Sequence, residues 1–164
     1  MKLICQVIVL LLSLNMVCSR TYASDSLPSL LQKNKITSLE QYLPWVGEYI
    51  QYNYYEGPHR SVEETLAKRV GSCYDFALLN KIALKTLGYN SEIWLLWNKG
   101  EKESHAVLVF KHKGYWCYTS DDAYIPTKII SYSKFRDYVK KVFIVTELYV
   151  VPTDYVPPER YPNQ

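Results

Sequence analysis

The chain has 164 residues, of which 48% are hydrophobic and 15% aromatic, so it is long and apolar enough to bury the core of one domain. Its 19 basic and 16 acidic residues nearly balance, which argues against the strongly basic surface that nucleic-acid binding requires. The sequence contains no internal repeat, coiled-coil heptad or glycine-rich phosphate loop.

The N-terminal segment has the pattern of a signal peptide. Lys2 precedes a mostly apolar run from Leu3 to Cys18, and Thr21-Tyr22-Ala23 is an acceptable cleavage site. Polar residues interrupt the run, which favours a cleaved signal over an uncleaved membrane anchor. We therefore expect a secreted or periplasmic protein with no membrane span after signal removal. The expected organisation is a signal peptide over 1–23, one domain over 24–151 and a Pro-rich extended tail over 152–164.

Helical patterns fill the first part of the expected domain. Residues 24–36 are polar and predict a loose lead-in, whereas 37–55 predict a helix with Ser38 as its N-cap. Ser61-Val62-Glu63-Glu64 is a capping box that opens a second, short helix to about Val70.

The next predicted helix begins with a cysteine. Ser72 is the expected N-cap and Asp75 its capping-box partner, and the helix runs from Cys73 to Leu87 and ends at Gly88. The unpaired N–H groups and the positive dipole end of a helix start favour a thiolate. Cys73 is therefore a candidate nucleophile.

Strand patterns dominate the rest of the chain. Glu92 to Trp97 is the first predicted strand, and a turn over residues 111–114 joins the runs 105–110 and 115–121 into an antiparallel hairpin. In such a hairpin the start of one strand lies opposite the end of the next, so His105 and Asp121 should be neighbours. Residues 131–141 predict a further helix and 142–151 a last strand.

These elements predict an α+β fold. The helices come first, an antiparallel sheet follows, and the helix of Cys73 packs on one face of that sheet. The strands carry apolar residues at both parities, so both faces of the sheet should be covered.

A thiol at a helix start beside a histidine that is oriented by a carboxylate is the arrangement of acyl-transfer enzymes. Asp121 and Asp122 compete for the carboxylate role, because one residue along a strand moves the side chain to the other face. Cys117 lies four residues before Asp121, roughly 13 Å along an extended strand, whereas a disulfide needs Cα atoms within about 7 Å. We therefore expect Cys117 to be a buried apolar residue, and no set of three or four ligands predicts a metal site.

The segment from Leu66 to Asp122 resembles the core of the transglutaminase-like superfamily, in particular the small bacterial transglutaminase-like cysteine peptidases. The motifs that carry the resemblance are Arg69-x-Gly71-x-Cys73-x-Asp75-Phe76-Ala77, Leu87-Gly88-Tyr89, His105-Ala106-Val107 and Tyr118-x-x-Asp121. The resemblance implies a papain-like core, with Cys73 as nucleophile, His105 as base and Asp121 as the orienting residue. Calcium-binding relatives carry more acidic residues near the nucleophile than the single Asp75 here, so no cofactor is expected.

Together these features predict an exported thiol enzyme that acts on a peptide or protein substrate. The enzyme would form a thioester with peptide or glutamine amide bonds, and hydrolysis by a cysteine peptidase or amidase is favoured. The alternatives are a protein-glutamine transglutaminase, which passes the acyl group to an amine, and a non-enzymatic binding module on the same fold. The residues alone indicate no particular substrate-binding side chain.

Overall fold

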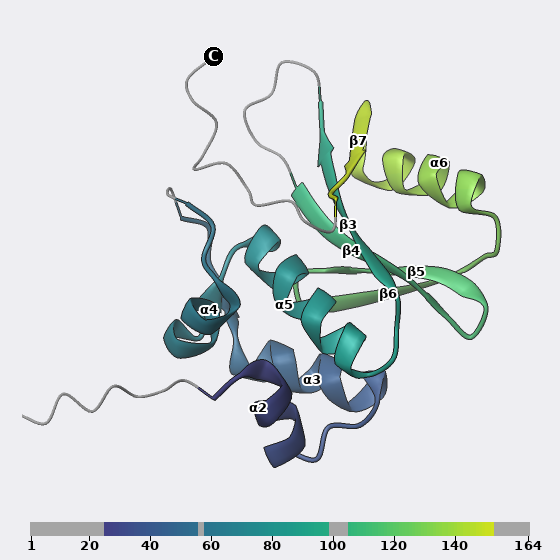
Figure 1. The fold of residues 1–164 in the computed structure, drawn as a ribbon. Helices are drawn as coiled ribbons and strands as arrows, with labels where there is room; N and C mark the ends of the chain where they lie inside the picture. Colours follow the sequence, from purple (N-terminus) through teal and green to yellow (C-terminus); the bar gives the residue numbers. More distant parts are fainter. Residues whose placement is uncertain (1–24, 56–57, 99–104, 153–164) are drawn as a thin grey trace, which may run out of the picture.

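A computed structural model describes residues 25–55, 58–98 and 105–152 (Figure 1). The predicted signal peptide, 1–23, lies outside these residues, as does the predicted Pro-rich tail apart from Pro152. In the part of the chain that is described, no helix is long and apolar enough to cross a membrane.

Four helices precede the strands of the main sheet in the described sequence. Their bounds are α2 Leu27–Lys33, α3 Leu39–Tyr49, α4 Val62–Lys68 and α5 Cys73–Thr86. Ser38 caps α3, and the predicted capping box of Ser61 and Glu64 opens α4. Helix α2 corrects the prediction of a loose lead-in, because Leu27, Leu30 and Leu31 lie on one helical face and are buried.

The main sheet has five antiparallel strands in the order β6-β5-β4-β3-β7, so β4 is central. Their bounds are β3 Ser91–Trp97, β4 His105–His112, β5 Tyr115–Ser120, β6 Ala123–Ile129 and β7 Glu147–Val150. A separate pair, β1 Gln51–Tyr52 and β2 Val70–Gly71, is parallel and links the end of α3 to the segment before α5.

Two strands of the main sheet differ from the prediction, and β1 lies where a helix over 37–55 was predicted. Strand β6 was not predicted. It contains Pro126, whose missing N–H is tolerated because β6 lies at the edge of the sheet. The last strand is shorter than 142–151, because helix α6, Tyr132–Phe143, extends past 141 and ends at Ile144 with φ 54°.

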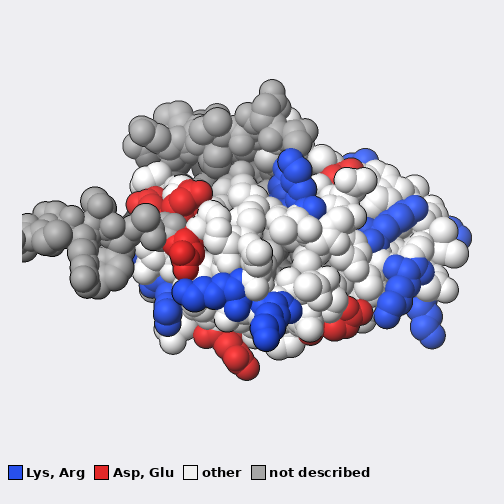
Figure 2. All heavy atoms as spheres, turned by 60° about the horizontal axis from the view of Figure 1, so that its bottom comes forward, with Lys and Arg blue, Asp and Glu red and all other residues white. Residues whose placement is uncertain are grey.

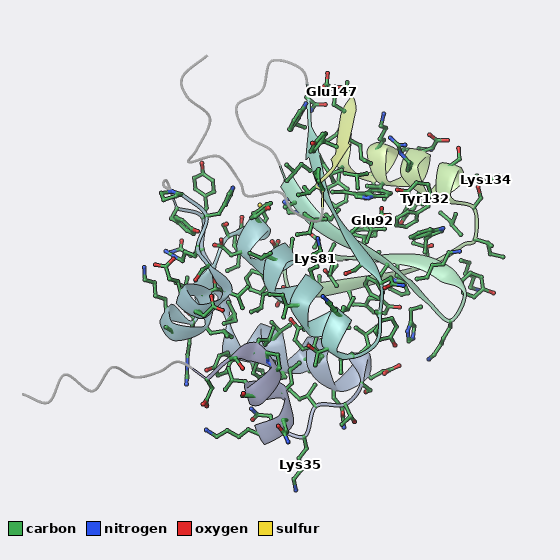
Figure 3. The ribbon with its side chains drawn as sticks, in the orientation of Figure 1. Lys35, Lys81, Glu92, Tyr132, Lys134 and Glu147 are labelled. Carbon is green, nitrogen blue, oxygen red and sulfur yellow. The ribbon has the colours of Figure 1, made fainter. Side chains whose placement is uncertain are left out.

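Both faces of the sheet are covered, as the apolar residues at both parities predicted. Ala106, Leu108 and Phe110 of β4 pack in the core with α5, whereas Val107 and Val109 pack with α6. In Figure 1 the two helices flank the strands on either side. Tyr132 at the start of α6 donates a hydrogen bond to Glu92 of β3 at 2.9 Å, and both residues are labelled in Figure 3. The α+β prediction is confirmed.

The charged side chains do not form one patch on the face that Figure 2 shows. Lysine and arginine side chains are scattered over this face, with aspartate and glutamate between them. This distribution matches the small net charge of +3 for the whole chain.

Candidate active site

Cys73 is the first residue of α5, as predicted. Asp75 accepts hydrogen bonds from the Ser72 backbone N–H at 2.8 Å and from the Ser72 hydroxyl at 3.1 Å. The first of these bonds is the carboxylate half of the predicted capping box. Asp75 is only 1% exposed, so these bonds satisfy a carboxylate that water hardly reaches. The cap fixes the first turn of the helix and, with it, the position of the Cys73 side chain.

Asp75 also joins the preceding segment to the start of α5, a role that the sequence did not reveal. Its carboxylate accepts a hydrogen bond from the Tyr55 hydroxyl at 2.7 Å and another from the Arg60 backbone N–H at 2.9 Å. The Arg60 guanidinium lies 3.8 Å from the centre of the Tyr55 ring and donates to the Val70 carbonyl oxygen at 2.9 Å. One buried carboxylate therefore ties three segments together beside Cys73.

The surroundings of the Cys73 thiol oppose ionisation on balance. Burial raises the pKa of the thiol; the Ala106 backbone N–H lowers it, the Asp121 charge raises it, and the Tyr74 N–H lowers it. We expected the helix start to favour the thiolate, and the N–H groups do act in that direction. Desolvation outweighs them because the side chain is mostly buried. Cys73 and Cys117 are both free thiols, and Cys117 is buried in the core as predicted.

His105 is the first residue of β4, and its ring contacts residues on two elements. Its Nε2 atom is hydrogen-bonded to Ser120 Oγ at 2.8 Å, and its ring centre lies 5.3 Å from that of Phe143 in α6. Burial lowers the pKa of the imidazole, so His105 is neutral near pH 7.

The hydrogen-bond partner of His105 is Ser120, which the sequence analysis did not predict. In the β4–β5 ladder Val107 lies opposite Ser120, so His105 and Ser120 are diagonal neighbours across the two strands. The usable signal was parity, because residues at alternate positions share a face of a strand. The Cys73 sulfur meets the same end of β4 at the backbone of Ala106, the residue after His105.

Asp121 lies in a turn and not at the end of a strand. Strand β5 ends at Ser120, which pairs with Ala123, so Asp121 and Asp122 form the two-residue connection to β6. Asp121 has φ 55°, a left-handed conformation that aspartate tolerates better than most residues. The strand-parity argument for choosing between the two carboxylates therefore does not apply to them.

The two carboxylates have different surroundings. The Asp121 charge acts on the Cys73 thiol, and Asp121 Oδ1 is buried without a hydrogen-bond partner among the described residues. Burial, followed by the charge of Asp122, raises the pKa of Asp121 to about 6. Asp122 Oδ2 instead packs against Gly47 of α3, 3.0 Å from where a Cβ on that glycine would lie.

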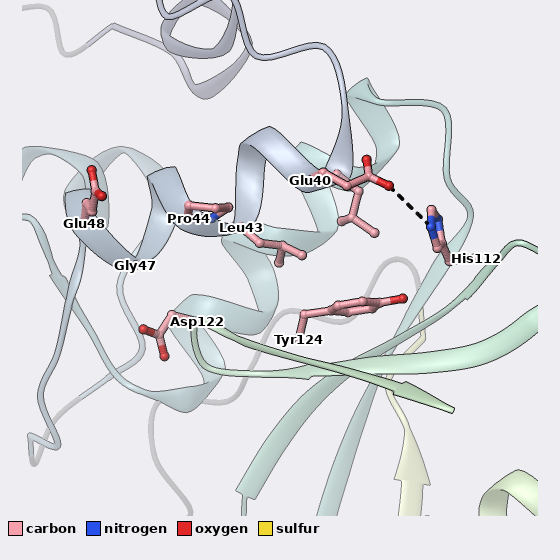
Figure 4. A pocket seen from close by; sticks show the side chains of 9 residues that line it. Glu40, Leu43, Pro44, Gly47, Glu48, His112, Asp122 and Tyr124 are labelled. Carbon is pink, nitrogen blue, oxygen red and sulfur yellow. Dashed lines mark ion pairs between the residues drawn. The ribbon is translucent and has the colours of Figure 1, made fainter. Parts of the chain in front are cut away.

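Asp122 lines a groove of about 620 Å³ between α3 and the sheet (Figure 4). Glu40, at the other end of the groove, lies 3.6 Å from His112, and Tyr124 lies between the two ends. This groove does not include Cys73, His105 or Asp121 among its lining residues. Among the described residues, no group of three or more His, Cys, Asp or Glu side chains could hold a metal ion.

Of the comparisons with known proteins, the one with protein-family models assigns a family. The family model of the transglutaminase-like superfamily matches residues 25–122, which is more than half of the chain and includes Cys73, His105 and Asp121. No curated protein sequence matches significantly. A crystal structure of a candidate cysteine protease from Cytophaga hutchinsonii is similar at a TM-score of 0.48 and 18% identity. That match covers 82% of this chain but 54% of the other, so the chain spans about half the length of that protein.

Proposed function

The chain belongs to the transglutaminase-like superfamily, and on that premise we propose that it is an exported thiol enzyme that acts on peptide or glutamine amide bonds. Cys73 is the nucleophile, His105 the base and Asp121 the residue that stabilises the charged base. The observation that carries the proposal is the position of the Cys73 sulfur, at a capped helix start beside the first residues of β4 and within reach of the Asp121 charge.

The proposal assigns separate roles to the two nitrogens of His105. Its Nε2 atom is hydrogen-bonded to Ser120 Oγ, and the proposal assigns to Nδ1 the role of accepting the proton of Cys73. Because burial raises the pKa of Cys73 and lowers that of His105, the resting pair is a neutral thiol and a neutral imidazole. Proton transfer then accompanies attack on the substrate. The Asp121 carboxylate, whose Oδ1 atom has no partner among the described residues, stabilises the imidazolium that forms.

The covalent steps follow from these roles. The Cys73 sulfur forms a bond to the amide carbonyl carbon while its proton passes to His105, and the Cys73 backbone N–H donates to the oxyanion. The C–N bond then breaks, and the imidazolium gives its proton to the departing amine or ammonia. Water attacks the resulting thioester, His105 takes the proton from that water, and the C–S bond breaks as the proton returns to sulfur.

Two alternatives share the same fold. If an amine instead of water resolves the thioester, the protein is a transglutaminase. We favour hydrolysis because water needs no second binding channel. A non-enzymatic module would use the fold only to bind its partner, and Cys73 would then be an inert residue.

The first experiment is alkylation of the thiol. The polypeptide 24–164 contains only Cys73 and Cys117, so iodoacetamide labelling followed by peptide mapping reports each thiol separately. We expect Cys73 to react, and replacement His105→Ala to slow the reaction near pH 7 by about 10²-fold, the lower end for loss of a general base. Cys117→Ala is the matched control and should leave the Cys73 rate unchanged. Equal rates with and without His105 would favour the binding module.

A second assay separates the two enzymatic outcomes. The protein is incubated with a glutamine-rich polypeptide, with and without a fluorescent primary amine. New N-termini or released ammonia indicate hydrolysis, whereas incorporated fluorescence indicates acyl transfer, and Cys73→Ala should abolish both. Export is tested by N-terminal sequencing of the protein recovered outside the cytoplasm. The proposal expects the chain to begin at Ser24, and a chain that still begins at Met1 would contradict signal cleavage.

A further inference from the structure

Three buried polar side chains connect α3, α5 and the end of β5. The Tyr42 hydroxyl donates to Asn80 Oδ1 at 2.6 Å. Asn80 Nδ2 donates to Thr119 Oγ1 at 3.1 Å and to the Asp121 backbone carbonyl oxygen at 3.0 Å. Tyr42 and Asn80 are 0% exposed and Thr119 is 1% exposed, so water does not compete for these bonds.

The partners of Asn80 determine which way its amide points. The Asp121 carbonyl oxygen can only accept, so the Nδ2 group must face β5 and Oδ1 must face the Tyr42 hydroxyl. Both Nδ2 protons and one Oδ1 lone pair are used. A buried amide that is satisfied in this way has one orientation, and it therefore holds its partners in fixed positions.

Two of the partners, Thr119 of β5 and Asp121 of the turn that follows, flank Ser120, the residue that is hydrogen-bonded to His105. Side chains alternate along a strand, so Asn80 holds this stretch of β5 from the α5 side while Ser120 points to the other side. Asn80 also lies seven residues after Cys73 on the same helix, about two turns away. A rigid helix therefore separates the amide from the candidate nucleophile by a fixed distance.

We propose that Asn80 is a positioning residue that fixes the end of β5 and the turn after it, and through them the Ser120 hydroxyl against His105. The inference rests on the proposed function, because positioning matters only if His105 acts on Cys73. Asn80 touches neither the thiol nor the imidazole in this role. It acts through Thr119 and the Asp121 carbonyl, and Tyr42 in turn fixes Asn80.

The test separates positioning from stability. Asn80→Leu removes the hydrogen bonds of the Asn80 amide and leaves the Tyr42 hydroxyl buried without its partner, so it should destabilise the fold. The double variant Tyr42→Phe/Asn80→Leu removes the Tyr42 hydroxyl together with the amide, so it should regain the part of that stability that the unpaired hydroxyl cost, whereas Thr119 Oγ1 and the Asp121 carbonyl oxygen still lack their donor. We expect the Cys73 alkylation rate near pH 7 to stay about 10²-fold below the wild-type rate in the double variant, the size expected for a displaced base. A Cys73 alkylation rate that recovers together with the stability would show that the hydrogen bonds of Asn80 have only a structural role.

Ser120→Ala tests the positioned contact directly and remains informative if the Asn80 variants fail to fold. It should give a similar loss of rate and change the titration of the His105 ring protons, which NMR can follow because the chain has only three histidines. Thr127→Val is the matched control: Thr127 Oγ1 donates to the Trp116 carbonyl oxygen at 2.6 Å, near the opposite end of β5. Its rate and titration should equal those of the wild type.

The outcomes also separate this inference from the proposed function. If His105→Ala leaves the wild-type alkylation rate unchanged, the proposed function fails. If His105→Ala slows the reaction but Ser120→Ala and the double variant do not, the proposed function stands and the positioning role of Asn80 is wrong.

Discussion

At the scale of single residues, burial favours the uncharged form of all three predicted site residues. It raises the pKa of Cys73, lowers that of His105 and raises that of Asp121 to about 6. Each shift favours the neutral form, because a partly buried site penalises charge. In the proposed reaction, Cys73 and His105 would therefore develop their charges as the substrate is attacked, without a preformed ion pair. This differs from the expectation that the helix start favours the thiolate of Cys73.

The raised pKa of Asp121 makes the stability of the fold depend on pH. Between about pH 4 and pH 6 the folded protein binds this proton more tightly than the unfolded chain, so the free energy of unfolding falls as pH rises. Asp121→Asn should remove that fall, which we expect to be at most about 1 kcal/mol because solvent reaches part of the side chain. Urea unfolding at pH 4, 5, 6 and 7 measures it.

Asp122→Asn is the control for this experiment, because Asp122 is exposed. It should weaken the repulsion on Asp121 but retain most of the pH dependence. Identical pH dependence in the wild type and in both variants would mean that Asp121 is not buried in the folded protein. Asp121→Asn also removes a charge that raises the pKa of Cys73. Slower Cys73 alkylation in this variant would therefore show that Asp121 acts mainly by stabilising the His105 imidazolium, as the proposal requires, whereas faster alkylation would contradict that role. Asp122→Asn should have a mild effect.

At the scale of elements, the sequence predicted best where local chemistry is strong. The capping boxes at Ser61 and Ser72 located the starts of α4 and α5 correctly, because a cap is a short-range pattern. Strand β6 escaped prediction because edge position, which makes Pro126 tolerable, is a property of the sheet. The contact between Ser120 and His105 escaped for a similar reason, since it depends on the register between two strands.

The two capping boxes provide a matched pair of tests. Ser72→Ala and Ser61→Ala should each lower the free energy of unfolding by about 1 kcal/mol, the usual cost of losing an N-cap. Only Ser72→Ala should also slow the reaction of Cys73, because Ser72 fixes the turn that carries the thiol and donates to Asp75. Thermal unfolding and iodoacetamide rates measure both effects. If Ser61→Ala lowers the free energy of unfolding as much as Ser72→Ala and also slows the alkylation of Cys73, the loss of stability and not the cap at Ser72 controls the reactivity of the thiol.

At the scale of the whole molecule, the sheet separates the two helices that surround the site. Helix α5 carries Cys73 on one face, whereas α6 covers the other face and places Phe143 against the His105 ring. The site therefore depends on packing at both faces.

Phe135 is the residue through which α6 is anchored. It is 0% exposed, and its ring contacts those of Trp94 on β3 and of Trp116 and Tyr118 on β5. Phe135→Ala should therefore lower the free energy of unfolding by about 3–5 kcal/mol, the usual cost of removing a buried phenyl ring. Urea unfolding measures this loss, and Lys134→Ala, at an exposed neighbouring position labelled in Figure 3, should change stability by less than about 0.5 kcal/mol.

Loss of the Phe135 side chain should also change the pKa of His105. When α6 packs less tightly, water gains access to the imidazole beside Phe143, and the lowered pKa of His105 should rise toward its ordinary value because burial is what lowers it. NMR titration of the His105 ring in Phe135→Ala, under conditions where the variant is folded, measures this rise. An unchanged pKa together with the full loss of stability would mean that α6 supports the fold without shaping the surroundings of His105.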